Sequence, residues 1–336
     1  MTQTEGTTMV NDDSNIPAKT TKKGGWHAAI FITCVEFAER FTSMGLSANL
    51  ITYLTKELSE FLDKAMIIDE HDVANNTRDP WRLCTLNQVE EVKLVLRLIP
   101  IWLSCLMFVV VQSQLATFFV KQGSTMNRSL GPNFQIPPAS LQGVVGVIIL
   151  FAVASYDRIF VPIVRKFTGH QSGITVLQRI GIGLFCSTLC MVVSALVEGK
   201  RVNAANQHKN NYNTIEGFSP MSIWWLLPQY AILGVADAFA VVGLQELFYT
   251  QMSEAMRSVG AAAFLSVLGV GNFVANAIID IVVEITSKSG GKWLVGNNLN
   301  KAHLDYFYWV LAGLSALSLG LYLLVSSSFV YKKVHV

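Results

Sequence analysis

The chain has 336 residues, of which 51% are hydrophobic and 14% charged, with a formal net charge of +2 at pH 7. A soluble domain has about 25% charged residues, so this composition excludes an ordinary water-soluble fold. The near-neutral charge, without a basic stripe interleaved with aromatic residues, also excludes a nucleic-acid partner.

Apolar stretches long enough to cross a lipid bilayer, which takes roughly 20 helical residues, recur along the chain. They cover residues 26–54, 94–120, 140–163, 174–198, 223–249, 260–285 and 307–330. Lipid offers no hydrogen-bond partner to the backbone, so continuous spans of this length must be helices. The sequence therefore predicts an all-α polytopic membrane protein with about seven transmembrane helices.

The polar segments between these stretches predict the domain organisation. Residues 1–25 are polar and lack the apolar core of a cleaved signal peptide, so we expect a disordered, cytoplasmic-type tail. An isolated first transmembrane helix is expected over 26–55, followed by a polar loop over 56–93. Residues 94–336 then predict a six-helix bundle, interrupted by a second polar segment over 199–220.

The first span carries three charged residues near its centre, Glu36, Glu39 and Arg40, in the stretch CVEFAERF. Each charge facing lipid there would cost about 2.5 to 3.5 kcal/mol, so these groups must be sheltered. Glu36 and Arg40 lie at i and i+4 and can pair within the helix. Glu39 is then desolvated beside another carboxylate, and both effects favour its protonated form. The pattern predicts a proton-carrying site, with a structural ion-pair network between helices as the alternative.

Two later spans also carry charged residues. In the third span, the adjacent Asp157 and Arg158 are expected to form a structural charge pair at the membrane edge. The fifth span ends near Gln245 and Glu246. Glu246 could be merely interfacial, could bind a cation or a cationic substrate, or could accept Arg40 from across the bundle.

The sixth span contains polar residues spaced by four. Asn272, Asn276, Asp280 and Glu284 therefore form one stripe along a helix. Such a stripe should face protein or water rather than lipid.

The cysteines predict no metal site. Most of them lie within apolar spans, where a thiol usually behaves as a small hydrophobe. Cys186 and Cys190 share a helix face, but no histidine or carboxylate pattern accompanies them.

The first helix motif resembles a known family. EFAER fits a Glu-x-x-Glu-Arg pattern, and its setting resembles the plant nitrate/peptide transporter branch of the proton-coupled oligopeptide transporters. Similar later segments are DPWRLCTLNQVEEVKLVLRLIPIW, FQIPPASLQ, YDRIFVPIVRKFTGHQSGITVLQRIGIG, LQELFYTQMSEAMRSVG and LNKAHLDYFYW. The resemblance covers nearly all of residues 24–334.

The resemblance implies a transporter rather than an enzyme, with a major facilitator fold of two six-helix bundles in the plasma or vacuolar membrane. It implies uptake of a small solute such as nitrate or a peptide, with the proton as coupling ion and no other cofactor. Glu36, Glu39 and Arg40 would serve proton coupling. Glu246 would be the substrate-binding acid on the tenth helix, with Gln245 beside it.

The resemblance also implies an internal truncation. Around Leu58 to Phe61 the sequence passes from the first helix into a segment that resembles the family's loop between helices six and seven. Helices two to six would then be missing, which leaves a partial major facilitator fold. Alternating access needs one bundle to move against the other, so we expect impaired transport. The alternatives are a regulatory or dominant-negative half-transporter that associates with a full-length relative, and a seven-helix receptor, which only the helix count favours.

Overall fold

The computed structural model describes most of the chain from Leu86 onward. The described residues are 57–58, 61–62, 64, 86–131, 133–168, 173–212, 219–252, 254–288, 293–294 and 299–329. The predicted N-terminal tail and first helix lie outside them, as do Glu36, Glu39 and Arg40.

The described part of the chain is built from helices, with two isolated β-bridges but no extended strand. The α-helices are α3 (Leu86–Ser113), α4 (Phe118–Ser124), α5 (Gln142–Ser155), α6 (Val161–Thr168), α7 (Val176–Tyr212), α8 (Leu227–Gln251), α9 (Arg257–Lys288) and α10 (Leu304–Ser327). The short helical turns are η2 (Pro138–Leu141), η3 (Tyr156–Phe160), η4 (Ile223–Leu226), η5 (Glu254–Met256) and η6 (Leu299–Lys301).

Within these residues, 6 helical stretches are long and apolar enough to cross a membrane. They are Gln88–Ser124, Pro138–Lys166, Val176–His208, Ile223–Gln251, Arg257–Lys288 and Leu304–Ser327. Each overlaps one of the predicted spans after the first. The prediction of an all-α polytopic membrane protein is confirmed.

The prediction of a polar loop over 56–93 placed the end of the loop too late in the sequence. Helix α3 already begins at Leu86, because its first turns are amphipathic. Val89 is buried, while Glu90 is more than half exposed and pairs with Lys93 one turn later, at 3.7 Å between Oε1 and Nζ. Charged residues in a sequence can therefore form the polar face of a helix rather than a loop.

The second polar segment, predicted over 199–220, is also helical over much of its length. Helix α7 continues to Tyr212 and has 37 residues, which corresponds to about 55 Å at 1.5 Å per residue. That length exceeds the roughly 30 Å hydrocarbon core of a bilayer. The end of α7 is therefore expected to project beyond the membrane.

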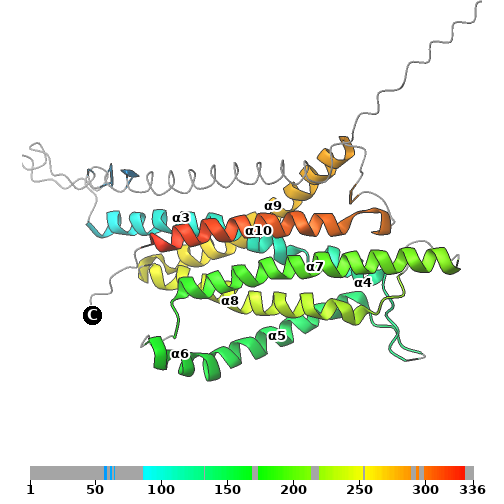
Figure 1. Cartoon of the computed structure of the whole chain (residues 1–336). Coiled ribbons are helices and arrows are strands. Elements are labelled where there is room, and N and C mark those ends of the chain that lie inside the picture. Colours follow the sequence, from blue (N-terminus) through cyan, green and yellow to red (C-terminus); the bar gives the residue numbers. More distant parts are fainter. Residues whose placement is uncertain are drawn as a thin grey trace, which may run out of the picture. The chain divides into compact units, whose positions relative to one another are not determined.

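The helices pack around two buried apolar clusters. Helix α7 packs against α8 and α10, α8 packs against α5, and α3 packs against α9 and α10 (Figure 1). Hydrogen bonds tie α10 to two neighbours: the Tyr322 hydroxyl donates to the Leu177 carbonyl at 2.7 Å, and the Ser318 hydroxyl donates to the Ser104 carbonyl at 2.6 Å. In lipid, where apolar surface alone does not drive helix association, such close contacts and hydrogen bonds hold the bundle together.

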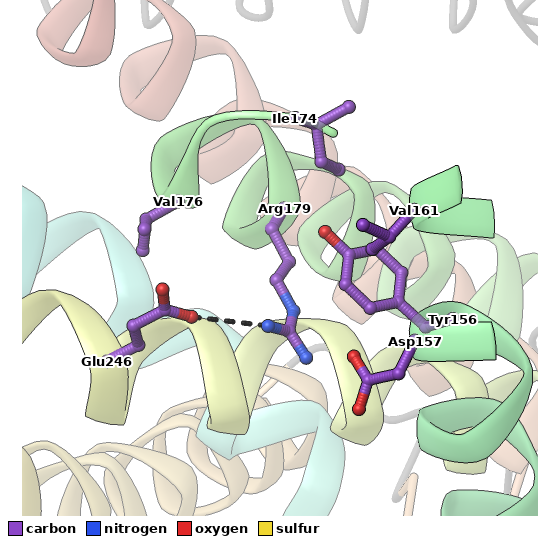
Figure 2. A pocket seen from close by; sticks show the side chains of 7 residues that line it. All are labelled: Tyr156, Asp157, Val161, Ile174, Val176, Arg179 and Glu246. Carbon is purple, nitrogen blue, oxygen red and sulfur yellow. Dashed lines mark hydrogen bonds and ion pairs between the residues drawn. The ribbon is translucent and has the colours of Figure 1, made fainter. Parts of the chain in front are cut away.

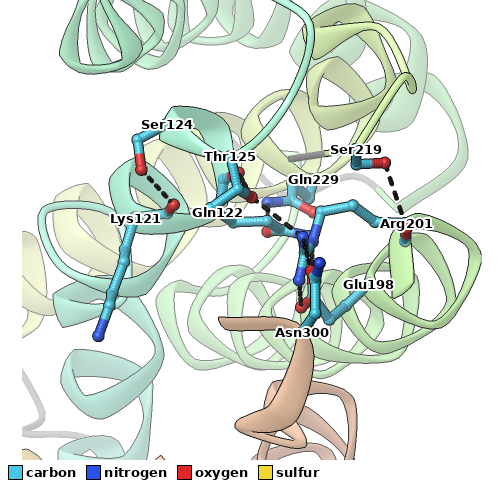
Figure 3. A network of polar contacts seen from close by, with 9 residues as sticks. All are labelled: Lys121, Gln122, Ser124, Thr125, Glu198, Arg201, Ser219, Gln229 and Asn300. Carbon is cyan, nitrogen blue, oxygen red and sulfur yellow. Dashed lines mark hydrogen bonds and ion pairs between the residues drawn. The ribbon is translucent and has the colours of Figure 1, made fainter. Parts of the chain in front are cut away.

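A buried ion pair joins α7 to the loops at one end of the bundle (Figure 3). Arg201 donates from Nε and Nη2 to the two carboxylate oxygens of Glu198, at 2.7 and 2.6 Å. Its Nη1 also donates to the Thr125 hydroxyl at 3.0 Å and to the Asn300 side-chain oxygen at 2.7 Å. The side chains of Glu198 and Arg201 are both 0% exposed. The network joins α7 to Thr125, which follows α4, and to Asn300 in η6. It therefore holds this end of the bundle together.

Candidate functional site

Glu246 lines a cavity of about 260 Å³ near one end of the bundle (Figure 2). The walls come from η3, α6, the start of α7 and the C-terminal half of α8. The lining residues are Tyr156, Asp157, Val161, Ile174, Val176, Arg179 and Glu246.

The guanidinium of Arg179 lies between an acid and an aromatic ring. Its Nη1 donates to Glu246 Oε2 at 3.2 Å, and its Cζ lies 4.4 Å from the centroid of the Tyr156 ring. The Arg179 side chain is 11% exposed and that of Glu246 is 36% exposed. Arg179 Nε is buried and has no hydrogen-bond partner within the described residues. A cation held over a ring beside a carboxylate is fixed in place while part of its hydrogen-bonding capacity remains unused.

Glycines set the distance between the two helices that carry this pair. A Cβ atom added at Gly183 of α7 would lie 2.5 Å from the Ala240 nitrogen of α8, and one at Gly243 would lie 2.9 Å from Ile180 Cγ1. Arg179 lies one turn before Gly183, and Glu246 lies just after Gly243. The close approach of the two backbones therefore brings the charged side chains within reach of each other.

A π-helical turn, η3, shapes the opposite wall of the cavity. It presents Tyr156 toward Arg179, and the Tyr156 ring is supported by edge contact with Phe239 at 5.4 Å between centroids. Single π-turns within α-helices are frequent at functional sites. Asp157, predicted to pair with Arg158, lines the cavity instead, and no ion pair joins the two in the described structure. Adjacent residues on a helix point about 100° apart, which explains why they do not meet.

The cavity combines one guanidinium, two carboxylates and a phenol with aliphatic side chains. Its volume lies just below the usual range of about 300 to 1,000 Å³ for ligand pockets, so a small solute would fit. Arg179 can bind an anionic group, and Glu246 or Asp157 can bind a cationic or hydrogen-bond-donating group. The arrangement is suited to binding a small polar solute.

The other predicted site residues do not join this cavity. Gln245 is exposed and is not among the lining residues, because it points away from its neighbour Glu246 on α8. A further acid on the same helix, Asp237, is buried and accepts a hydrogen bond from Gln112 Nε2 at 3.2 Å. The proton-coupling role of Glu36, Glu39 and Arg40 stays a prediction, since these residues lie outside the described part of the chain. Within that part, no group of His, Cys, Asp and Glu could hold a metal ion.

Sequence reasoning missed Arg179 and Tyr156 as site residues. A signal for Arg179 was present, because it is a charged residue inside the apolar stretch 174–198. Its partner Glu246 is 67 positions away, and no local pattern links them. Tyr156 carried no signal, since an aromatic residue within a membrane span is ordinary.

Comparison with known proteins identifies the family. The sequence profile of the POT family, PTR2, matches residues 20–297. Protein NRT1/ PTR FAMILY 5.4 of Arabidopsis thaliana is 58% identical over 301 residues, which cover 89% of this chain and 54% of that protein. Protein NRT1/ PTR FAMILY 5.10 of the same plant is 47% identical over 285 residues, which cover 85% of this chain and 49% of that protein. The chain thus spans about half the length of the curated relatives it matches.

A solved structure supports the same fold. The crystal structure of an auto-inhibited POT family peptide transporter matches with a TM-score of 0.52 and 20% sequence identity, covering 74% of this chain and 43% of that chain. At this identity the match concerns the fold alone. With the spans described above, these matches make the chain an integral multi-pass membrane protein. The chain belongs to the POT family, which is a family of membrane transporters and not of enzymes.

Proposed function

We propose that this chain carries one wall of the solute site of a proton-coupled transporter, with Glu246 as the substrate-binding acid. The observation that supports the proposal best is the Arg179–Glu246 pair in the wall of a small polar cavity. Related proteins carry NRT1/PTR names, and the matched solved structure is described as a peptide transporter. Nitrate and small peptides are therefore the solute classes to test first.

The Arg179–Glu246 pair can respond to an anionic solute. An anionic group of the solute would compete with the Glu246 carboxylate for the guanidinium of Arg179, which it could bind in the same way. Glu36, Glu39 and Arg40 provide the proton-carrying group of this mechanism, as their sequence pattern suggests.

The chain by itself is transport-impaired under this proposal. It spans about half the length of its relatives, 54% in the first case. Alternating access requires a second bundle that moves against the first around the site. One wall of a site can bind a solute without moving it across the membrane.

Transport in vesicles tests the proposal. Purified chain reconstituted in lipid vesicles with an imposed pH gradient is expected to accumulate no nitrate or dipeptide above empty vesicles. The same chain with helices two to six of NRT1/PTR FAMILY 5.4 inserted, which the resemblance implies are missing, is expected to accumulate solute. Accumulation by the unaltered chain would overturn the assignment of impaired transport.

In the restored form, Glu246→Gln is expected to reduce proton-driven uptake by tenfold or more, an effect of about 1.4 kcal/mol or greater. Glutamine keeps the shape of the side chain but cannot carry the charge that pairs with Arg179. Glu254→Gln is the matched control, since Glu254 is 89% exposed and pairs with Arg257 outside the cavity. Equal uptake by the two variants would exclude Glu246 from the solute site.

A further inference from the structure

Helix α9 packs against its neighbours by one side only. A Cβ atom added at Gly271 would lie 2.5 Å from Val109 Cβ, and Trp102 Nε1 donates to the Ser266 hydroxyl at 2.9 Å, so α9 lies close against α3. Only 17% of its most apolar 18-residue segment is buried inside the described structure. Most of the surface of α9 is therefore exposed within the described structure and must be covered by lipid, water or another protein.

The polar face of α9, formed by Asn272, Asn276, Asp280 and Glu284, is exposed along its whole length. Asn272 Nδ2 donates to the Leu268 carbonyl within its own helix, at 2.8 Å. Glu284 is paired with Lys288 at 2.7 Å between Oε1 and Nζ. The side chains of Asn276 and Asp280 have no hydrogen bond or ion pair within the described residues.

This face lies too deep in the membrane to be solvated at the surface. It extends over about 18 Å of a 32-residue helix, and Asn272 and Asn276 are at the middle of that helix. Polar and charged groups at such depth nearly always face protein or water. The polar face of α9 is therefore not a lipid-facing surface.

The stretch Pro138–Lys166, which contains α5, provides an internal comparison, because only 11% of its most apolar part is buried inside the structure. The large exposed side chains of α5 are apolar, including Leu150 at 73% and Phe151 at 70% exposure. Lipid can cover that surface without cost. Helix α9 also exposes large apolar side chains, such as Phe273 at 77%, but it adds a stripe of four polar residues, and low burial alone does not explain these.

The charge of the face indicates what covers it. Lys288 compensates Glu284, so Asp280 is the uncompensated charge. Two copies of this chain, inserted in the same orientation and related by a two-fold axis, would bring Asp280 against the same residue of the other copy. A suitable partner instead carries hydrogen-bond donors and a basic side chain at that depth.

We propose that the polar face of α9 docks a separate POT-family polypeptide that supplies the part of the fold not spanned by this chain. The relatives contain about as much additional sequence as this chain matches, since it covers 54% and 49% of their lengths. The docking proposal rests on family membership, and its test measures association without any solute flux. The docking proposal can therefore fail while the proposed solute site stands. The solute site can also fail while the docking proposal stands.

Co-purification tests the docking surface directly. The full 336-residue chain with an affinity tag is co-expressed with the part of NRT1/PTR FAMILY 5.4 that the matched residues leave uncovered. The triple substitution Asn272→Leu, Asn276→Leu and Asp280→Leu is expected to lower the recovered partner by about tenfold, since interhelical hydrogen bonds in a membrane are lost. The matched control is Leu150→Ala with Phe151→Ala on α5, which should recover as much partner as the parent chain.

A second measurement does not depend on the triple variant folding. In Asn276→Cys, the new thiol should react with a maleimide in the chain alone, and the partner should lower this labelling about fivefold. In the control Phe151→Cys, the thiol should be labelled to the same extent with and without the partner. Both readings are taken relative to the parent chain, whose described cysteines include the buried Cys105 and Cys190. Unchanged partner recovery by a well-folded triple variant, or no protection at position 276, would overturn the proposal. Recovery of a second, differently tagged copy through the same face would also overturn it.

Discussion

Glu198→Ala is expected to lower the free energy of unfolding by about 3 to 5 kcal/mol, the largest effect of any substitution considered. The change leaves the guanidinium of Arg201 fully buried without its counter-ion, after removing two hydrogen bonds of 2.7 and 2.6 Å. The remaining contacts of Arg201, to Thr125 and Asn300, do not neutralise its charge. Thermal unfolding of the purified chain in detergent measures the effect.

Two further variants show whether the destabilisation by Glu198→Ala comes from leaving Arg201 without its counter-ion. The double substitution Glu198→Met and Arg201→Met removes both charges and is expected to be less destabilising than Glu198→Ala alone. Glu254→Ala breaks the exposed pair with Arg257 and should be nearly neutral. If Glu198→Ala unfolds at the same temperature as Glu254→Ala, the buried pair is not what holds this end of the bundle together.

Gly183→Ala is expected to destabilise the bundle by about 1 to 3 kcal/mol, because a single added carbon meets backbone rather than a movable side chain. The new Cβ would lie 2.5, 2.6 and 2.8 Å from the nitrogen, Cβ and Cα of Ala240. Helices α7 and α8 would have to separate, which would also lengthen the Arg179–Glu246 contact. Thermal unfolding measures the first effect, and solute uptake by the restored transporter measures the second.

Gly199→Ala is the matched control, since it makes the same substitution on the same helix. A Cβ at Gly199 meets nothing within 4 Å. Alanine also favours helix more than glycine does, by about 1 kcal/mol, so this variant should be neutral or slightly more stable. Equal unfolding temperatures of the two alanine variants would show that the close approach of α7 and α8 at Gly183 does not limit the stability of the bundle.

Local sequence features predicted some residues of the site and misplaced others. Glu246 was predicted because it is an acid at the end of an apolar span within a family-like segment, and it does line the cavity. Gln245 was predicted beside it, but its orientation on α8 directs it elsewhere. Arg201 was assigned to a polar connection, whereas it is the fully buried centre of a network. A single charged residue looks the same in a sequence whether it faces water or a buried partner.

The sequence by itself determined the membrane class, the six confirmed spans and the family, because crossing lipid requires long apolar helices that appear in any linear reading of the chain. It also determined that α9 carries a polar stripe, since helical periodicity follows from spacing alone. Only the tertiary structure decided that Arg179 meets Glu246, that Arg201 meets Asn300, and that the stripe on α9 is left uncovered. These outcomes depend on how closely and at what rotation distant helices pack, which is set by glycine contacts such as Gly183 against Ala240 and not by hydropathy.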